Sequence, residues 1–347
     1  MLIIGGLGYL GSYLTEYLYK YNYSCTVYDV GFFKNGKLSK INKNFKFKKI
    51  DARDIKKDDM SNFDVVIQLA AISNDPFNGL SNNRVYKPSV KYTQKIAKYC
   101  KELNIRFIFP SSCSIYGYNK NICHEKTKAN PQTGYSENKF EIEKELKLLR
   151  DKNFTPIILR LATVYGFSPR IRFDVVINML IGMAITENKI TLNSNGDAWR
   201  PHIHIDDVCH VIKSFMEIKL YHNQSYIINV GSNNNNLKII DIAKTISKIT
   251  KVPISYLKNT NDNNSSLIVD RKINDGVDKR SYAVNFDRLK KNYDIRLKYN
   301  IEKGIKELYQ KLKKIKLKKN LYKKRDFYRL QQLEYLIKNN KINNFLR

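Results

Sequence analysis

Short apolar runs alternate with longer amphipathic stretches through the first half of the chain. The pattern predicts six buried strands, at Leu2–Ile4, Cys25–Tyr28, Phe45–Ile50, Val65–Leu69, Ile105–Phe109 and Pro156–Leu159. Between them it predicts helices near residues 9–21, 87–103 and 134–150. Because unbroken apolar strands alternate with helices, we expect a parallel sheet that is covered on both faces. Right-handed crossovers then make this an α/β fold with a doubly wound sheet, whose ligands bind at the carboxyl ends of the strands.

The alternation becomes looser after residue 165. The spacing predicts helices near 173–186, 206–219, 238–250 and 301–314, and strands at Ile190–Leu192 and Tyr226–Val230. Residues 259–280 are polar without a clear period, which predicts a loop, whereas apolar residues at 327, 330, 333 and 337 have helical spacing. We expect one domain over residues 1–170, to which 206–236 return, a smaller α/β domain over 171–310, and a basic helical extension over 311–347.

The net charge of +30 is large for a chain of 347 residues. It favours an anionic partner, such as nucleic acid, an acidic membrane or phosphorylated small molecules. However, the lysines are spread along the whole chain, so we interpret most of the charge as compositional drift and expect no nucleic-acid partner. The densest basic cluster runs from Lys311 to Arg325. We interpret it as a solvated helix face, with binding to an anionic membrane surface or an acidic partner as the alternative.

Five cysteines are present without any C-x-x-C pair, at Cys25, Cys100, Cys113, Cys123 and Cys209. Their odd number and spacing predict reduced thiols rather than disulfides or a zinc site. No apolar run approaches the length that spans a bilayer, and no basic-then-apolar leader precedes the first strand. We therefore expect a cytoplasmic protein without a transmembrane segment.

A glycine-rich turn joins the first strand to the first helix. Its spacing is G-x-x-G-x-x-G, with Gly5, Gly8 and Gly11 at the three positions. Gly5 allows the tight exit from the strand, Gly8 allows the backbone to approach a pyrophosphate, and Gly11 allows the helix to pack closely on the sheet. The helix start, at Tyr9 and Leu10, offers unpaired N–H groups and a positive dipole to the phosphates. The turn therefore predicts dinucleotide binding.

Acidic and small residues follow the next strands of the predicted sheet. Asp29 ends the second strand, where a carboxylate accepts hydrogen bonds from adenosine ribose hydroxyls and repels a 2′-phosphate. No arginine follows Asp29 closely, so we expect NAD rather than NADP. After the third strand, Asp51 and Ala52 are expected to meet the adenine. The fourth strand ends in small residues that allow close passage of the cofactor, at Leu69, Ala70 and Ala71.

Three residues form the predicted catalytic group. Tyr135 and Lys139 stand four apart, so they share one face of the predicted helix. An ammonium beside a phenol favours the phenolate and lowers its pKa. A tyrosine in that state can take a proton from a sugar hydroxyl while hydride leaves the same carbon. Ser112 follows the fifth strand and is expected to hydrogen-bond the reacting oxygen.

With these motifs the sequence resembles the extended short-chain dehydrogenase/reductase family, in its sugar-nucleotide epimerase/dehydratase branch. The matching segments are Gly5–Gly11, Leu69–Ala71, Ser111–Gly117, Tyr135–Lys139, Arg160, Tyr165–Gly166 and Gly196–Asp207. The resemblance implies a Rossmann-type NAD-binding domain, a carboxyl-terminal domain that holds a nucleoside diphosphate sugar, and a homodimer. It casts Tyr135 as the base. It also implies that Arg200 and Arg280 contact the substrate's nucleotide and phosphates, which suits the bidentate pairing of guanidinium groups with phosphate oxygens.

The chain departs from the family pattern at two places. Family dehydratases usually carry an acid directly after the catalytic Ser or Thr, but Cys113 and Ser114 stand here, which argues against 4,6-dehydration. Cys113 is expected to be a packing residue and Ser114 a substrate contact. Thr163 replaces an Asn of many epimerases, which changes contacts to the substrate phosphates. Arg172 is expected over the sugar pocket.

Three functions stay open on these residues. The first is C4 epimerisation of a nucleotide sugar, in which hydride returns to the opposite face of a keto sugar. The second is a net C4 dehydrogenase or reductase, which needs the same three catalytic residues. The third is a catalytically silent NAD-binding protein with a basic interaction tail. His202 and His204 could also be metal ligands on one strand face, but we interpret them as part of a strand that borders the substrate cleft and expect no metal.

Overall fold

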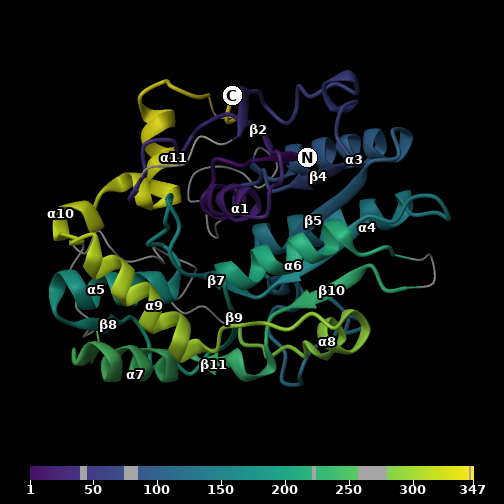
Figure 1. Ribbon diagram of the computed structural model, residues 1–347. Coiled ribbons are helices and arrows are strands. Elements are labelled where there is room, and N and C mark those ends of the chain that lie inside the picture. The colour runs from purple at the N-terminus through teal and green to yellow at the C-terminus, as the bar shows by residue number, and fades with distance from the viewer. Residues whose placement is uncertain (40–44, 74–84, 221–223, 257–279, 344) are drawn as a thin grey trace.

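The computed structural model describes residues 1–39, 45–73, 85–220, 224–256, 280–343 and 345–347. Its largest element is a seven-stranded sheet with the strand order β10-β6-β5-β4-β1-β2-β3 (Figure 1). The strands are β1 (Leu2–Ile4), β2 (Thr26–Asp29), β3 (Lys46–Lys49), β4 (Val65–Gln68), β5 (Arg106–Ser112), β6 (Ile157–Leu161) and β10 (Ile227–Val230). Every neighbouring pair in this sheet is parallel. The predicted doubly wound parallel sheet is therefore confirmed.

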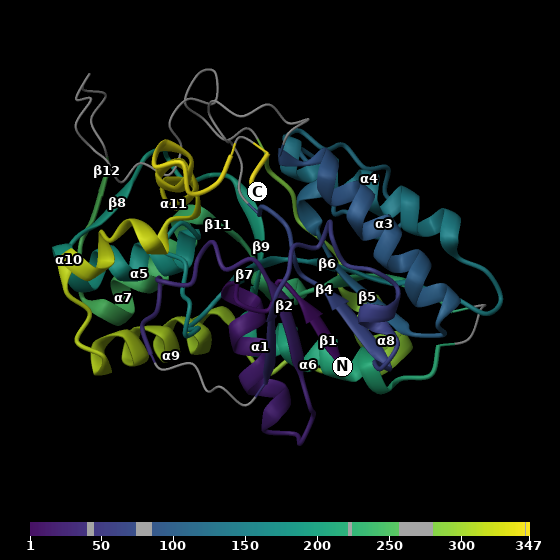
Figure 2. The same cartoon turned by 90° about the horizontal axis from the view of Figure 1, so that it is seen from above.

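Helices cover both faces of this sheet because its central strands are apolar on both sides. Helices α1 (Tyr9–Tyr19) and α6 (Ile205–Glu217) pack on one face, and α3 (Lys87–Glu102) and α4 (Gly134–Leu149) pack on the other (Figure 2). Alternate residues of one strand feed the two cores, as Ile3 lies in the first core and Leu2 in the second. This layering places the carboxyl ends of the strands at one edge, where the glycine turn and the start of α4 also lie.

Most of the chain that follows β6 builds a second, smaller body, whereas α6 and β10 return to the large sheet. The smaller body contains a three-stranded sheet of β7 (Thr163–Tyr165), β9 (Trp199–His204) and β11 (Asn236–Lys238), and a two-stranded sheet of β8 (Ile190–Leu192) and β12 (Ile254–Tyr256). Helices α5 (Val176–Glu187), α7 (Ile239–Thr250) and α9 (Ile301–Lys314) pack together around it, and α8 (Asp287–Tyr293) packs against β10. The expected smaller α/β part is thus present.

The carboxyl-terminal extension folds back over the molecule. Its helices are α10 (Lys319–Tyr322) and α11 (Arg329–Lys338). Gln332 of α11 donates a 3.1 Å hydrogen bond to the carbonyl of Phe32, directly after β2. In Figure 1 the yellow α11 accordingly lies beside the purple amino-terminal region. The extension therefore packs on the body of its own chain, next to the carboxyl ends of the strands.

Several elements differ from the sequence-based expectations in their bounds. The fifth strand continues through Pro110 to Ser112, because these residues still pair with β6. The helix expected from residue 173 begins at Val176. The strand β7 and the short helices α8 and α10 were not predicted. The loop predicted over residues 259–280 lies almost wholly outside the described residues.

Candidate active site

The glycine turn has the geometry that its spacing predicts. Gly5 has a φ of +85°, and a Cβ there would lie 2.5 Å from the backbone nitrogen of Ala70. A Cβ on Gly11 would lie 2.6 Å from the Cα of Gly6. A Cβ on Gly8, by contrast, would meet nothing closer than the carbonyl of Gly5 at 3.4 Å. As the N-cap residue of α1, Gly8 makes no side-chain cap hydrogen bond, which leaves a cradle that suits a phosphate.

One cavity of about 870 Å³ runs from this turn along the carboxyl edge of the sheet. All of the predicted site residues line it. They are Gly5, Gly8, Tyr9, Leu10, Gly11, Asp29, Asp51, Ala52, Leu69, Ala70, Ala71, Ser112, Ser114, Tyr135, Lys139, Thr163, Arg172, Arg200 and Arg280. The structure thus brings together residues from both bodies of the chain, and the individual roles assigned to them stay predictions.

Asp29 organises the end of this cavity at which the adenosine is expected. Its carboxylate accepts hydrogen bonds from the N–H groups of Leu7, at 2.9 Å, and Gly31, at 2.6 Å. Burial raises the pKa of Asp29, while the two N–H donors and the charges of Arg170 and Arg329 oppose the rise. The carboxylate therefore both braces the glycine turn and presents acceptors to the cavity. The sequence shows no arginine close after Asp29, but the fold brings Arg170 and Arg329 near it from distant segments.

Asp51 lies at the same end but is already paired. Its carboxylate accepts hydrogen bonds from the backbone N–H of Arg53, at 2.9 Å, and from the Arg53 Nε, at 2.8 Å. Burial alone would raise the pKa of Asp51, but the hydrogen bonds and charge of Arg53 lower it. Asp51 is therefore held as a carboxylate, which leaves less free acceptor capacity for an adenine amino group than its sequence position suggests.

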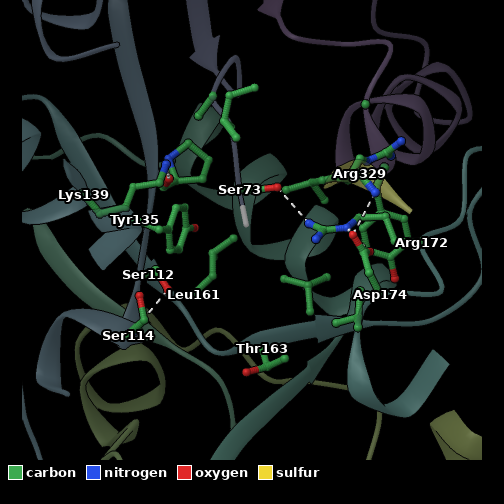
Figure 3. A pocket seen from close by; sticks show the side chains of 18 of the residues that line it. Ser73, Ser112, Ser114, Tyr135, Lys139, Leu161, Thr163, Arg172, Asp174 and Arg329 are labelled. Atoms are coloured by element: carbon green, nitrogen blue, oxygen red, sulfur yellow. Dashed lines mark hydrogen bonds and ion pairs between the residues drawn. The ribbon is translucent and has the colours of Figure 1, made fainter. Parts of the chain in front are cut away.

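The predicted catalytic residues lie on one side of the cavity (Figure 3). Helix α4 begins with a capping box between Thr133 and Ser136, which fixes the first turn that carries Tyr135. Lys139 is buried, and its Nζ lies 5.8 Å from the centre of the Tyr135 ring. The same Nζ donates a 2.9 Å hydrogen bond to the carbonyl of Pro110. Burial lowers the pKa of Lys139 to about 8, although the charge of Glu143 works in the opposite direction.

Ser112 stands at the end of β5, close to this pair. Its Oγ accepts the backbone N–H of Ser114 at 3.1 Å, which starts the following turn of 3₁₀ helix. In Figure 3 the side chains of Tyr135, Ser112 and Ser114 lie on one side of the cavity. Those of Arg172 and Asp174 lie on the other. The arrangement leaves room between the two sides for a substrate.

A buried ion pair that the sequence did not predict supports this group. Arg160 of β6 donates hydrogen bonds to Glu143 of α4, the shortest at 2.7 Å, and the two side chains are 3% and 0% exposed. Ser111 donates a 2.6 Å hydrogen bond to the same carboxylate. Because Glu143 is one turn beyond Lys139, the pair ties the catalytic helix to β5 and β6. Sequence analysis provided two separate signals, the family match at Arg160 and the i, i+4 spacing of Glu143 after Lys139, but nothing that paired them.

The cavity is also lined by several arginine side chains. Arg172 donates a 2.7 Å hydrogen bond to Asp174 and a 2.8 Å one to Ser73. Arg200 donates to the carbonyls of Trp199 and Arg280. Sequence analysis also missed Arg329, which lines the cavity from the carboxyl-terminal extension. Several guanidinium groups in one cleft favour a ligand with more than one phosphate.

The two histidines of β9 take part in separate structural contacts. His202 is buried next to the carbonyl of Arg200, and burial lowers the pKa of His202 to about 3. His204 stacks on Tyr299, with ring centres 3.9 Å apart, and its Nε2 lies 2.8 Å from a carboxylate oxygen of Glu307. Within the described ranges, no three His, Cys, Asp or Glu side chains gather closely enough to hold a metal ion.

The comparisons with known proteins agree with this geometry. Residues 1–231 match the NAD dependent epimerase/dehydratase family. The chain belongs to this family. The predicted family and the predicted NAD cofactor are therefore confirmed, and the open cradle at Gly8 fits the cofactor's phosphates. In the part of the chain that the structure describes, no helix is both long and apolar enough to cross a membrane.

Individual relatives are distant. The bifunctional polymyxin resistance protein ArnA of Wigglesworthia glossinidia brevipalpis is 27% identical over 289 residues, which are 76% of this chain and 42% of that protein. An uncharacterized UDP-glucose epimerase of Bacillus subtilis, YtcB, is 30% identical over 147 residues, which are 42% of this chain and 46% of that protein. The chain thus spans about half the length of these curated relatives.

The solved structures show the same fold. The UDP-glucuronic acid 4-epimerase of Bacillus cereus, in complex with UDP-glucuronic acid and NAD, superposes with a TM-score of 0.74 at 23% identity. The match covers 90% of this chain and 99% of that one. This likeness supports the architecture of both bodies of the chain, whereas the reaction has to be inferred from the site.

Proposed function

We propose that this protein epimerises a nucleoside diphosphate sugar at C4 through a transient 4-keto intermediate. One juxtaposition carries the proposal: Tyr135, Lys139 and Ser112 share a cavity with the glycine turn of a family that uses NAD. The relatives and neighbours named as nucleotide-sugar epimerases support the substrate class.

Tyr135 is the proposed base. Its phenol takes the proton of the C4 hydroxyl while hydride leaves the same carbon. Bound NAD supplies the hydride acceptor and later the donor. Lys139 favours the phenolate through its charge, and the hydrogen bond to Pro110 holds its ammonium in place. Ser112 donates a hydrogen bond to the reacting oxygen. When the keto sugar turns over in the site, hydride returns to its opposite face and Tyr135 returns the proton.

The diphosphate of the substrate is proposed to lie on the arginine-rich side. Arg200 and Arg280 meet its phosphates, and Thr163 and Ser114 lie nearer the sugar. Arg172 is held between Asp174 and Ser73, which places its guanidinium across the cavity from Tyr135 (Figure 3). Because the Arg172 guanidinium is held by two hydrogen bonds before a ligand binds, we propose that it orients the sugar and does not move when the sugar binds.

The residues after Ser112 argue against dehydration. Cys113 is 1% exposed, and its thiol donates to the carbonyl of Arg160 at 3.2 Å. Burial raises the pKa of Cys113 well above its usual value, so this thiol is no proton donor to a leaving hydroxyl. Ser114 is not an acid. The position from which family dehydratases protonate the departing hydroxyl therefore carries a packing residue.

The test is incubation with a panel of nucleoside diphosphate sugars, followed by chromatography, mass spectrometry and absorbance of NADH. Epimerisation predicts a product of unchanged mass with a new retention time and no build-up of NADH. A product that has lost two hydrogens, with accumulating NADH, would indicate a net dehydrogenase instead. Loss of water would indicate a dehydratase and contradict the interpretation of Cys113.

Tyr135→Phe provides the matched test of the mechanism. The variant keeps the ring and its packing but has no proton to exchange. We expect turnover to disappear while NAD remains bound, as measured in the same assays and by the absorbance of released cofactor. Turnover that survives in Tyr135→Phe would remove Tyr135 as the base.

A further inference from the structure

Helix α11 buries polar residues together with apolar ones. The apolar residues at 327, 330, 333 and 337 have helical spacing. Phe327 and Leu333 are indeed buried, but Arg329 is only 4% exposed and Gln332 only 3% exposed. The helix thus presents a guanidinium and an amide to the body of the protein. Burying a charged side chain is expensive unless something pairs with it, so the position of Arg329 needs an explanation.

The protein provides acceptors for only some of the hydrogen-bond donors of the Arg329 guanidinium. The guanidinium stacks on the Phe33 ring, 4.1 Å from its centre, and Nη2 has one long contact of 3.5 Å to the carbonyl of Arg170. Nη1 is buried and has no hydrogen-bond partner among the residues that the structure describes. Burial lowers the pKa of Arg329 to about 9, and the positive charge of Arg172 adds to this effect. The side chain is therefore held in place by stacking, whereas its Nη1 donor meets no acceptor among the described residues.

The charges around Arg329 leave one excess positive charge at this place. Three guanidinium groups, of Arg170, Arg172 and Arg329, lie within electrostatic reach of two carboxylates, Asp29 and Asp174. Burial also lowers the pKa of Arg170, whose Nε meets no acceptor in the described part of the chain. Of these two buried arginines, Arg329 lines the cavity, and its unused donor suits an anionic ligand with several acceptor oxygens.

The surroundings of Arg329 in the cavity favour the pyrophosphate of a dinucleotide as this anionic ligand. Arg329 lines the same cavity as Gly8, Tyr9 and Leu10. It also acts on the charge of Asp29, whose carboxylate is bonded to the glycine turn at Leu7. The guanidinium therefore lies on the wall of this cavity that the segment after β2 forms, over Phe33 and close enough to Asp29 to act on its charge. In Figure 3 it lies on the same side of the cavity as Arg172 and Asp174.

We propose that Arg329 binds the pyrophosphate of NAD and makes the carboxyl-terminal extension part of the cofactor site. The pyrophosphate lies between two walls, with the N–H groups of the glycine turn on one side and Arg329 on the other. The inference rests on cofactor binding by this cleft and not on the epimerase reaction proposed above. A second contact agrees with it, because Arg53 donates 2.7 Å hydrogen bonds to the carbonyls of Phe345 and Leu346 at the adenosine end.

The test compares two ligands that differ in the pyrophosphate. NAD-free protein is titrated calorimetrically with ADP-ribose, which contains it, and with adenosine, which does not. Arg329→Met should weaken ADP-ribose binding about ten- to a hundred-fold, the range for loss of a hydrogen bond to a charged group, and leave adenosine binding unchanged. Lys338→Met, which removes an exposed charge from the same helix, should change neither. Unchanged ADP-ribose affinity in Arg329→Met, or an equal loss for both ligands, would overturn the proposal.

A measurement on the unmodified protein does not depend on the folding of a variant. ADP-ribose should slow amide hydrogen exchange in residues 329–338, whereas adenosine should not. Exchange in α11 that ignores ADP-ribose would refute the contact. Tyr135→Phe should bind ADP-ribose as the wild type does, whatever its turnover, so a failure of the epimerase proposal and a failure of the Arg329 proposal give different results.

Discussion

Lys139 provides a quantitative test of the buried catalytic group. Its side chain is 5% exposed, and burial lowers the pKa from 10.5 to about 8. Keeping Lys139 protonated therefore lowers the unfolding free energy of the protein. This cost is fully present below the folded pKa and disappears as the pH rises toward the unfolded pKa. The difference between the two pKa values corresponds to about 3 kcal/mol of unfavourable free energy at pH 7.

Lys139→Met makes this cost visible because methionine has no proton to bind. Between pH 7 and pH 9 the folded wild type has released most of this proton, whereas the unfolded chain still holds it. The wild type should therefore gain about 1 kcal/mol of unfolding free energy relative to Lys139→Met over this interval. Urea unfolding at both pH values measures the difference, in which other titrating groups cancel.

The control is Lys147→Met, which removes an exposed lysine from the same helix. It should follow the wild type at both pH values. If wild type and Lys139→Met instead change in parallel between pH 7 and pH 9, Lys139 does not carry a lowered pKa. The reasoning that burial tunes the catalytic ammonium would then be refuted.

Two further predictions concern residues that support the site. Asp29→Ala should weaken NAD binding and reduce the preference for NAD over NADP in titrations of NAD-free protein, and equal affinity for both cofactors in the wild type would contradict the role of Asp29. Glu143→Leu leaves the Arg160 guanidinium buried without its partner, so the unfolding free energy should fall by about 3–5 kcal/mol. The double variant Glu143→Leu/Arg160→Met should recover part of that loss, and a single variant as stable as the wild type would disprove the importance of the pair.

The sheet could be predicted because its strands are buried on both faces. Ile3 and Ile67 are fully buried, so their segments read as unbroken apolar runs. The end of β5 could not be predicted in the same way. Pro110, Ser111 and Ser112 look like a loop in the sequence, but they extend the strand because β6 lies beside them and Glu143 accepts the Ser111 hydroxyl.

Some residues of the candidate site could likewise be predicted from local sequence, and others could not. The glycine turn and the Tyr135/Lys139 pair are set by short spacings, and local sequence therefore reveals them. Arg329 is different, because its spacing predicts a helix but does not say which face is buried. That face is decided by the contacts with Phe32 and Phe33, which no pattern within residues 327–337 contains.

The contact between α11 and the segment after β2 also sets the order in which the cleft is completed. Phe32 and Gln332 are 300 positions apart in the chain. During synthesis the glycine turn emerges first, and its opposite wall follows only after the second body has been made. A folding intermediate with a finished sheet and an undocked last helix would hold the dinucleotide on one side alone and release it readily. If Arg329 binds the cofactor as proposed, lasting retention of the dinucleotide would therefore begin only when α11 has docked.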